Sequence, residues 1–257
     1  MSFLNQRFVK RLTQLSDELL VQDTSAALKQ AAAEAALAEV RSGMRLGLGT
    51  GSTAAFVVEG LAARLADGRL RDVAGAPTSR ATAALAQKLG VPLLDLSAVR
   101  RLDLALDGAD EVGPNLGLIK GGGAALLREK IIAAAADCFV VVADNSKRVD
   151  MLGAFALPVE IVDFAAPITI AAVRALLDRL RLPSDRVALR KSAAGGAYLR
   201  TDGGNLVLDL ACKAIPDPEA LAAGLAHIPG VVENGLFLGL AQRAYIASAN
   251  GVDCVRV

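Results

Sequence analysis

Histidine and cysteine, the residues from which most zinc and redox sites are built, are scarce in this chain, which has one histidine and three cysteines among 257 residues. His227 has no second histidine with which to share a metal ion, so we expect it to be structural or exposed. Cys138, Cys212 and Cys254 lie far apart and form no CxxC pair. We therefore expect no metal, no cofactor and a reducing, cytoplasmic compartment.

Strong net charge and long apolar runs are also missing. Lysine and arginine number 28 against 27 for aspartate and glutamate, which gives a net charge of +1. We therefore expect neither nucleic acid nor a membrane as a partner. The longest apolar stretch, residues 131–143, is interrupted by Asp137 and is shorter than the ~20 residues that span a bilayer. The N-terminus lacks the apolar core of a signal peptide, and the 53% hydrophobic composition predicts a globular protein that recognises any anion locally.

Short apolar runs alternate with helical patterns in the first part of the chain, after two predicted helices at residues 8–19 and 26–40. The expected strands are residues 46–48, 73–74, 102–106 and 139–143, and the expected helices between them are residues 53–65, 79–89 and 124–136. Alternation of strands and helices predicts a mostly parallel sheet with helices on both faces.

The pattern changes after Gly153. The expected elements are a strand at 157–162, a helix at 167–180, a hairpin of strands 197–201 and 205–209 joined by Asp202-Gly203-Gly204, and a helix at 218–226. Strands 231–237 and 244–248 are then expected to return to the main sheet, with a last hairpin turning at Asn250-Gly251. We predict a main domain of residues 1–153 and 230–257, with residues 1–25 as a helical extension, and a small α+β domain of residues 154–229.

Polar segments follow four of the predicted strands of the main sheet. They are Gly49-Thr50-Gly51-Ser52-Thr53, Pro77-Thr78-Ser79, Asp107-Gly108-Ala109-Asp110-Glu111 and Asp144-Asn145-Ser146-Lys147. Ligands of open parallel sheets bind beyond the carboxyl ends of the strands. The sequence therefore predicts a binding site at this edge of the sheet.

The segment from Gly49 to Thr53 combines two glycines with three hydroxyls at the start of a helix, a composition that suits a phosphate. An ordinary tight turn, with Ser52 or Thr53 as the helix N-cap, explains it equally well. Gly49-x-Gly51-x-x-Ala54 also fits a loose dinucleotide-binding pattern. That interpretation is weakened because no acidic residue follows the second strand, and no Walker lysine is present.

Lys120-Gly121-Gly122-Gly123 precedes a predicted helix that carries Arg128-Glu129-Lys130 among aliphatic residues. At ~100° per residue the three charges point in separate directions, so they do not form one solvated face. A buried carboxylate near a lysine is the combination that tunes a catalytic base, although charged helix residues are more often simply solvated or paired. Asp107, Asp110, Glu111 and Lys147 could likewise be turn, cap or surface residues.

Taken in series, these segments resemble type A ribose-5-phosphate isomerase. The matching stretches run in family order from about residue 26 to the C-terminus: GLGTGSTAAFVVEGL, LALDGADEV, IKGGGAALLREKIIAAAAD, VVVADNSKRVDMLG, LPVEI and IPGVVENGLF. The resemblance implies a Rossmann-like α/β domain with an inserted, smaller ferredoxin-like α+β domain, in a homodimer or homotetramer. The first 25 residues precede the family pattern and inherit no role.

The implied activity is the interconversion of ribose 5-phosphate and ribulose 5-phosphate through an enediol or enediolate, an intramolecular oxidation and reduction without metal. The resemblance makes Glu129 the proton acceptor, and our mechanistic hypothesis adds Lys120 and Asp107 as catalytic residues. The expected substrate contacts are Thr50, Gly51, Ser52, Thr53, Asp107, Gly108, Ala109, Asp110, Lys120, Gly121, Gly122, Gly123 and Lys147.

Two other functions fit the same architecture. Sugar-phosphate deaminases and CoA transferases resemble it, but the series DGADE, KGGG and REK favours the isomerase. A phosphosugar-binding regulator that has lost catalysis would normally lack the base or the lysine, whereas Glu129, Lys120 and Asp107 are all present, and no basic stripe or DNA-binding helix pair is evident.

Overall fold

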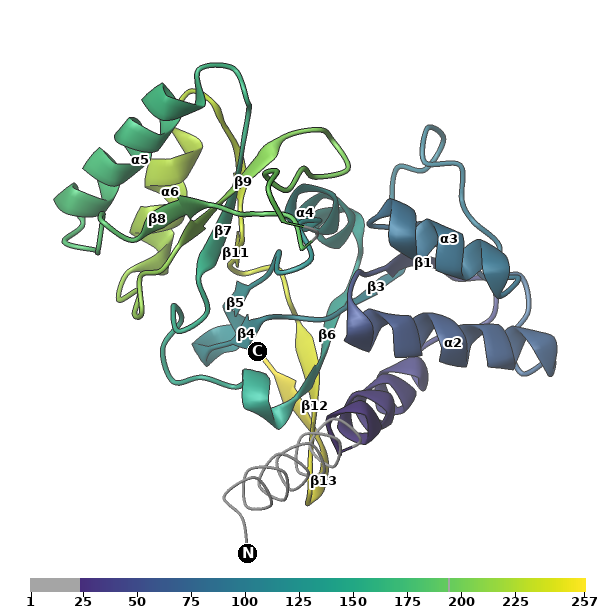
Figure 1. Cartoon of the computed structure of the whole chain (residues 1–257). Helices are drawn as coiled ribbons and strands as arrows, with labels where there is room; N and C mark the ends of the chain where they lie inside the picture. The colour runs from purple at the N-terminus through teal and green to yellow at the C-terminus, as the bar shows by residue number, and fades with distance from the viewer. Residues whose placement is uncertain (1–23, 194) are drawn as a thin grey trace, which may run out of the picture.

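A six-stranded, mostly parallel sheet forms the centre of the molecule in the computed structural model, which describes residues 24–193 and 195–257 (Figure 1). Its strands are β1 (Arg45–Leu48), β2 (Ala74–Pro77), β3 (Leu104–Asp107), β6 (Phe139–Asp144), β12 (Arg243–Ser248) and β13 (Gly251–Arg256), in the order β13-β12-β6-β3-β1-β2. Only β13 is antiparallel to its neighbour. The parallel sheet and the hairpin at Asn250-Gly251 are thus confirmed, whereas the helix expected at residues 8–19 lies outside the described residues.

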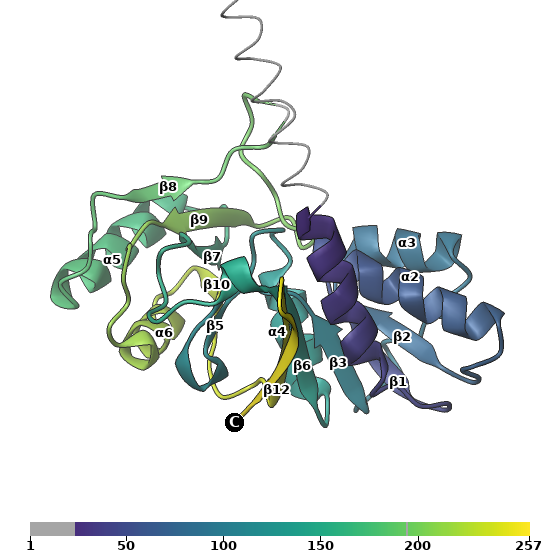
Figure 2. The same cartoon turned by 90° about the horizontal axis from the view of Figure 1, so that it is seen from below.

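Helices cover both faces of this sheet. The helix at residues 24–37, α2 (Ser52–Ala66) and α3 (Arg80–Lys88) lie on one face (Figure 2), and α4 (Leu126–Ala135) packs on the other. Leu106 and Val140 pack beneath the first group, whereas Ala105 and Val141 face the core that contains α4. Strands β3 and β6 are buried along their whole length for this reason.

Helix α4 packs directly against the backbone of β1 at Gly47, where a side chain would leave no room for it. A Cβ atom at Gly47 would lie 2.5 Å from Ile132 Cγ2 and 2.8 Å from Ala105 Cβ. The same helix carries Glu129, so the close packing sets the depth at which that carboxylate lies.

A second, antiparallel sheet has the order β10-β7-β9-β8 and carries two helices (Figure 1). Its elements are β7 (Leu157–Ile161), α5 (Ala166–Arg179), β8 (Val187–Leu189), β9 (Leu206–Leu210), α6 (Pro218–Ala226) and β10 (Val231–Asn234). We call residues 157–234 the small unit; its core is separate from those of the main sheet. The predicted α/β fold with a smaller α+β unit is therefore confirmed.

Two strand predictions are wrong. Residues 197–201 form isolated bridges instead of a strand: Tyr198 pairs with Lys191, and Arg200 pairs only with Leu206 at the start of β9, because β8 occupies the rest of that edge and β7 the other. Residues 231–237 do not return to the main sheet: β10 pairs with β7, and β11 (Leu236–Phe237) pairs with β5 (Leu118–Ile119). The division into domains at residues 153/154 and 229/230 stays a prediction.

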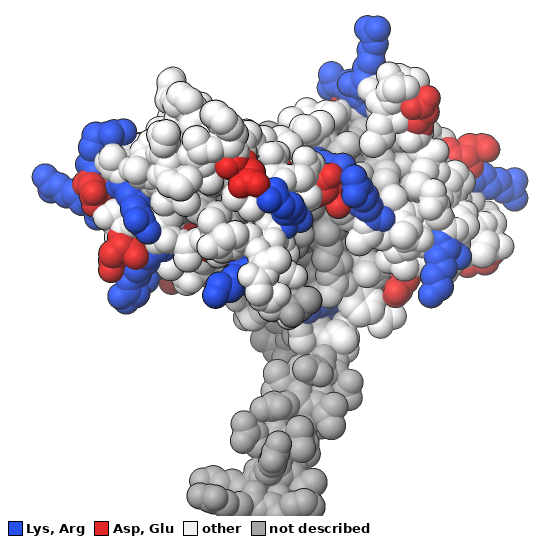
Figure 3. Space-filling view, turned by 45° about the horizontal axis from the view of Figure 1, so that its top comes forward, with Lys and Arg blue, Asp and Glu red and all other residues white. Residues whose placement is uncertain are grey.

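A three-stranded sheet, β11-β5-β4, joins the two larger sheets, with β4 formed by Glu111–Val112. The single-turn helices η1 (Pro114–Leu116) and η2 (Asn145–Lys147) complete the described elements. On the face shown in Figure 3, basic and acidic side chains are interspersed, in keeping with the balanced composition. None of the helices within residues 24–193 and 195–257 is long and apolar enough to cross a membrane.

Candidate active site

A pocket opens beyond the carboxyl ends of β1, β3 and β6, the edge of the sheet where the sequence predicts a site. Its walls are Lys29, Thr50, Gly51, Ser52, Thr53, Gly108, Ala109, Asp110, Lys120, Gly121, Gly122, Gly123, Glu129 and Lys147. Every residue expected at the site lines this pocket except Asp107, which is buried beside it. Three of the four polar segments predicted after strands therefore meet in the pocket, as the strand topology requires, whereas none of residues 77–79 lines it.

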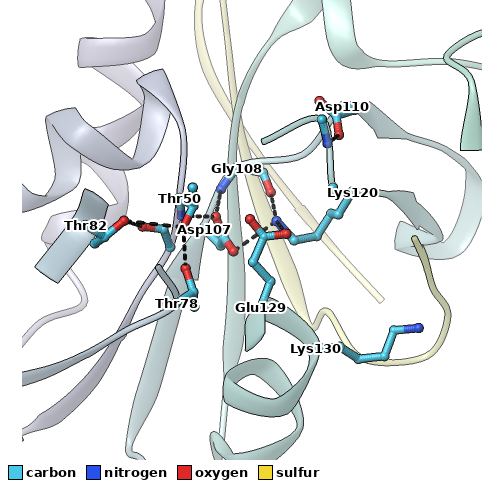
Figure 4. A network of polar contacts seen from close by, with 12 residues as sticks. Thr50, Thr78, Thr82, Asp107, Gly108, Asp110, Lys120, Glu129 and Lys130 are labelled. Carbon is cyan, nitrogen blue, oxygen red and sulfur yellow. Dashed lines mark hydrogen bonds and ion pairs between the residues drawn. The ribbon is translucent and has the colours of Figure 1, made fainter. Parts of the chain in front are cut away.

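Three buried charged side chains form the floor of the site (Figure 4). Lys120 Nζ lies 2.9 Å from Asp107 Oδ2 and 3.4 Å from Glu129 Oε2. The three side chains are only 3–5% exposed. A buried cation between two carboxylates offsets part of the desolvation that each charge suffers on its own.

Asp107 is fixed by the backbone around it. Its Oδ1 accepts hydrogen bonds from the N–H groups of Thr50, at 3.1 Å, and Gly108, at 2.7 Å. A Cβ atom at Gly49 would lie 2.0 Å from the same oxygen, so a residue with a side chain at 49 would displace the carboxylate. The first glycine of the predicted phosphate loop is therefore required for the position of Asp107.

Lys120 is placed by the end of β5. Its backbone N–H donates to Gly235 O at 2.9 Å, and its ammonium group donates to Gly108 O at 2.5 Å. The ammonium nitrogen also lies 5.4 Å from the centre of the Phe237 ring. The side chain thus reaches the floor of the pocket from the opposite side to Asp107 (Figure 4).

The three charges on α4 point in separate directions, as the helical spacing predicts. Arg128 pairs with Asp202 at 2.9 Å, Lys130 pairs with Glu233 at 2.7 Å, and Glu129 turns into the site. Glu129 Oε2 is the one buried side-chain oxygen or nitrogen, among the described residues, that has no hydrogen-bond partner. An unsatisfied carboxylate oxygen beside a pocket is available to a substrate proton.

Burial strongly alters the acidity of Glu129. Desolvation raises its pKa from 4.5 to about 8; Lys120 opposes this shift, and the neighbouring Asp107 adds to it. Burial also raises the pKa of Asp107 against the opposing effect of Lys120 and its backbone hydrogen bonds. For Lys120, burial lowers the pKa, but the two carboxylates outweigh it, so the pKa is raised and the lysine stays charged.

The loop that precedes α2 is open to an anion. The helix N-cap is Gly51, with φ 103°, and no side chain caps the helix, so the interpretation of Ser52 or Thr53 as the N-cap is wrong. The first N–H groups of α2 therefore have no capping side chain, and Ser52 and Thr53 line the pocket beside them. Lys29 Nζ lies 3.2 Å from Ser52 Oγ, and Lys147 lines the pocket from η2.

Several residues support the pocket without being foreseen in that role. Thr50 Oγ1 lies 2.7 Å from Thr78 Oγ1 and 3.3 Å from Thr82 Oγ1, which ties the loop to the start of α3 (Figure 4). Thr78 lies in a polar segment that the sequence does mark, after the second strand. Lys29 stands in an alanine-rich helix, where nothing local distinguishes it from a surface lysine.

Two acidic residues of the Asp107–Glu111 segment have structural contacts. Asp110 Oδ2 accepts the N–H of Gly122 at 2.7 Å, while the residue also lines the pocket. Glu111 is buried and accepts the N–H of Gly153 at 2.7 Å, which ties down the chain leading to the small unit. Glu111 is thus a structural residue, one of the alternatives that the sequence leaves open. His227, at the end of α6, is exposed, as expected.

Comparisons with known proteins agree on one family. The family model of ribose 5-phosphate isomerase A (phosphoriboisomerase A) matches residues 74–251. Ribose-5-phosphate isomerase A of Roseiflexus sp. (strain RS-1) is 55% identical over 87% of this chain and 93% of the relative. That of Sinorhizobium fredii (strain NBRC 101917 / NGR234) is 54% identical over 87% of this chain and 95% of its own.

Solved structures give the same result. Ribose 5-phosphate isomerase from Plasmodium falciparum superposes with a TM-score of 0.85 at 34% identity, covering 90% of this chain and 99% of the other. A D-ribose-5-phosphate isomerase in complex with phospho-erythronic acid gives 0.83 at 36% identity, covering 91% and 99%. The chain therefore belongs to the ribose-5-phosphate isomerase A family, the enzymes that interconvert ribose 5-phosphate and ribulose 5-phosphate.

Proposed function

We propose that this chain uses Glu129 as the base that interconverts ribose 5-phosphate and ribulose 5-phosphate. The observation that carries the proposal is the buried Oε2 of Glu129, which has no hydrogen-bond partner and lies 3.4 Å from Lys120 Nζ beside the pocket. A base with a pKa of about 8 is matched to proton transfer near neutral pH.

The reaction moves one proton between carbons and one between oxygens. In the open-chain aldose, Glu129 removes the proton from C2, and the electrons of that bond form the C1–C2 double bond while the carbonyl electrons move to O1. The ammonium group of Lys120 stabilises the negative charge that develops on the enediolate. Glu129 then returns its proton to C1. Asp107 assists ring opening and carries the hydroxyl proton from O2 to O1, while Asp110 holds the sugar hydroxyls.

The phosphate end binds on the other side of the pocket. The N-terminus of α2, with Thr50, Gly51, Ser52 and Thr53, supplies N–H groups and hydroxyls, and Lys147 adds positive charge. Lys29 lies close enough to Ser52 to add a second cation. Binding energy from this remote group fixes the sugar for reaction. A related D-ribose-5-phosphate isomerase was solved in complex with phospho-erythronic acid, which supports a phosphorylated sugar as the ligand here.

We also propose a cytoplasmic homodimer or homotetramer. The family resemblance supports the oligomer, and Phe164 and Ile168 in the small unit expose 88% and 73% of their area, as apolar residues at subunit contacts do in a separated chain. The cysteines Cys138, Cys212 and Cys254 are all unpaired, as in a reducing compartment.

The protein is expected to form ribulose 5-phosphate from ribose 5-phosphate at full rate in excess EDTA. The ammonium group of Lys120 supplies the positive charge that a metal ion supplies in a metal-dependent isomerase. In the described part of the chain, no three histidine, cysteine, aspartate or glutamate side chains converge to hold a metal ion. Ketose formation is followed with and without EDTA. Loss of activity in EDTA, restored by a divalent metal, contradicts metal independence. Release of ammonia from glucosamine 6-phosphate would favour the deaminase instead.

The pH dependence of kcat/KM is expected to rise through an apparent pKa near 8, because Glu129 must be deprotonated in the free enzyme to accept the C2 proton. The second ionisation of a sugar phosphate, at about 6, lies well below this range and so is separable. Initial rates are measured over a range of about pH 5.5 to 9.5. A flat profile between about pH 7 and 9 contradicts the assignment of a raised pKa to the base.

A further inference from the structure

Arg190 joins the small unit to the glycine loop of the active site. It follows β8, and its guanidinium forms a two-fold ion pair with Asp209 of β9, with Nε 2.9 Å from Oδ2 and the second nitrogen bonded to Oδ1. The remaining nitrogen donates to the carbonyl oxygens of Gly121 and Gly122, both at 2.9 Å. The Arg190 side chain is only 15% exposed, so these bonds are partly shielded from water.

The direction of the two carbonyls determines the direction of the next N–H groups. In a trans peptide unit the C=O and N–H bonds point in opposite directions, and none of the described peptide bonds is cis. With the Gly121 carbonyl on Arg190, the Gly122 N–H points the other way, where it donates to Asp110. By the same geometry the Gly123 N–H turns away from Arg190. A Cβ atom at Gly123 would lie 3.4 Å from Thr50 Cγ2, so Gly123 lies close to the phosphate loop.

The loop needs such an external constraint. Gly121 has φ +104° and Ala124 has φ 59°, both in the left-handed region, and three successive glycines have more backbone freedom than any other tripeptide. The loop also connects Lys120 to α4, which carries Glu129. A planar guanidinium, oriented by a carboxylate, is suited to hold two carbonyls at once, and a lysine ammonium lacks this fork.

We propose that Arg190, oriented by Asp209, is a positioning residue for the Gly121–Gly123 loop: it directs the Gly122 N–H to Asp110 and the Gly123 N–H toward the phosphate end of the substrate. The inference rests on the proposed function of the pocket. An ion pair serving stability alone would need only the bonds between Arg190 and Asp209, whereas two further bonds cross from the small unit to the wall of the pocket.

The test compares Arg190→Ala and Arg190→Lys with the control Arg200→Ala. Arg200 pairs with Asp163 at 2.6 Å and donates to the Gly204 carbonyl, both within the small unit. The measurements are kcat and KM for ribose 5-phosphate, direct binding of inorganic phosphate by calorimetry, and the thermal midpoint. Both Arg190 variants are expected to weaken phosphate binding and raise KM by roughly 10-fold or more, since charged hydrogen bonds are lost. Arg200→Ala should leave both near wild type.

Chemical rescue separates positioning from folding. Millimolar guanidinium is expected to recover part of the activity of Arg190→Ala, because it can occupy the space between Asp209 and the two carbonyls, and to leave Arg200→Ala unchanged. The inference is overturned if the Arg190 variants lower the thermal midpoint but bind phosphate and substrate like wild type. If wild type shows no isomerase activity, the proposed function fails, and phosphate binding by the variants still decides the role of Arg190.

Discussion

Glu129→Gln is expected to lower kcat by at least ~10²–10⁴-fold while KM and phosphate affinity stay near wild type. The amide keeps the size of the side chain but cannot accept the C2 proton. The phosphate loop lies on the other side of the pocket and is left intact. The rates come from a continuous assay of ketose formation, with phosphate affinity measured by competition.

The matched control is Glu233→Gln. Glu233 pairs with Lys130, which follows Glu129 on α4 but points away from Glu129 and Lys120 in Figure 4. Neither residue lines the pocket, so turnover near wild type is expected. Near-normal turnover in Glu129→Gln would remove the carboxylate from its assigned role. If Glu233→Gln lowers turnover as much as Glu129→Gln does, the loss reflects general damage to the packing of α4 and not removal of the base.

Glu129→Gln also tests the raised pKa of Glu129, through the pH dependence of the free energy of unfolding. Between the ordinary carboxyl pKa of 4.5 and the folded value of about 8, the folded state holds a proton that the unfolded chain has released. The free energy of unfolding of the wild type should therefore fall as pH rises through this window. Glu129→Gln lacks this titration, so urea unfolding should show a smaller fall over the same range.

Lys120→Met is expected to lower kcat by about 10²–10³-fold and to destabilise the protein by about 3–5 kcal/mol near neutral pH. The ammonium group provides the donor for the enediolate, and its removal leaves the carboxyl groups of Asp107 and Glu129 buried without a cation. Because the pKa of an unpaired buried carboxyl rises, the stability deficit should shrink at pH 5 and grow at pH 8.

The double variant Lys120→Met/Asp107→Asn separates the two effects. It removes Asp107, one of the two carboxyl groups left without a cation, so the free energy of unfolding should recover part of the loss. Turnover should stay low because neither the oxyanion donor nor the oxygen-to-oxygen proton carrier is present. Recovery of turnover along with stability would mean that Lys120 acts only by holding the fold together. Urea unfolding and steady-state kinetics on the same preparations decide between these outcomes.

The alternation of strands and helices was enough to predict the parallel sheet, because that pattern leaves few topologies that bury both faces. It failed at residues 197–201 and 231–237. Both segments are apolar enough for strands, but their pairing depends on which sheet edges are already occupied. Strands β7 and β8 take the edges of β9, and β10 joins β7 rather than β12.

The sequence by itself determined the chemistry at the edge of the sheet. The glycine loop follows β1, Asp107 ends β3 and Lys147 lies in the segment after β6, so the parallel topology brings these three together at one edge of the sheet. The helical spacing around Glu129 also separated it from its charged neighbours. These properties follow from local periodicity and strand direction, which can be read from the sequence alone.

Only the tertiary structure decided how that chemistry is tuned. The pKa of Glu129 depends on burial under α4 and on its distances to Lys120 and Asp107, which local sequence does not contain. The contacts of Lys29, Thr78 and Arg190 arise the same way, because each side chain contacts a pocket residue from a segment distant in sequence. Burial and through-space charge are properties of the packed chain, so they appear only once the sheets and helices are assembled.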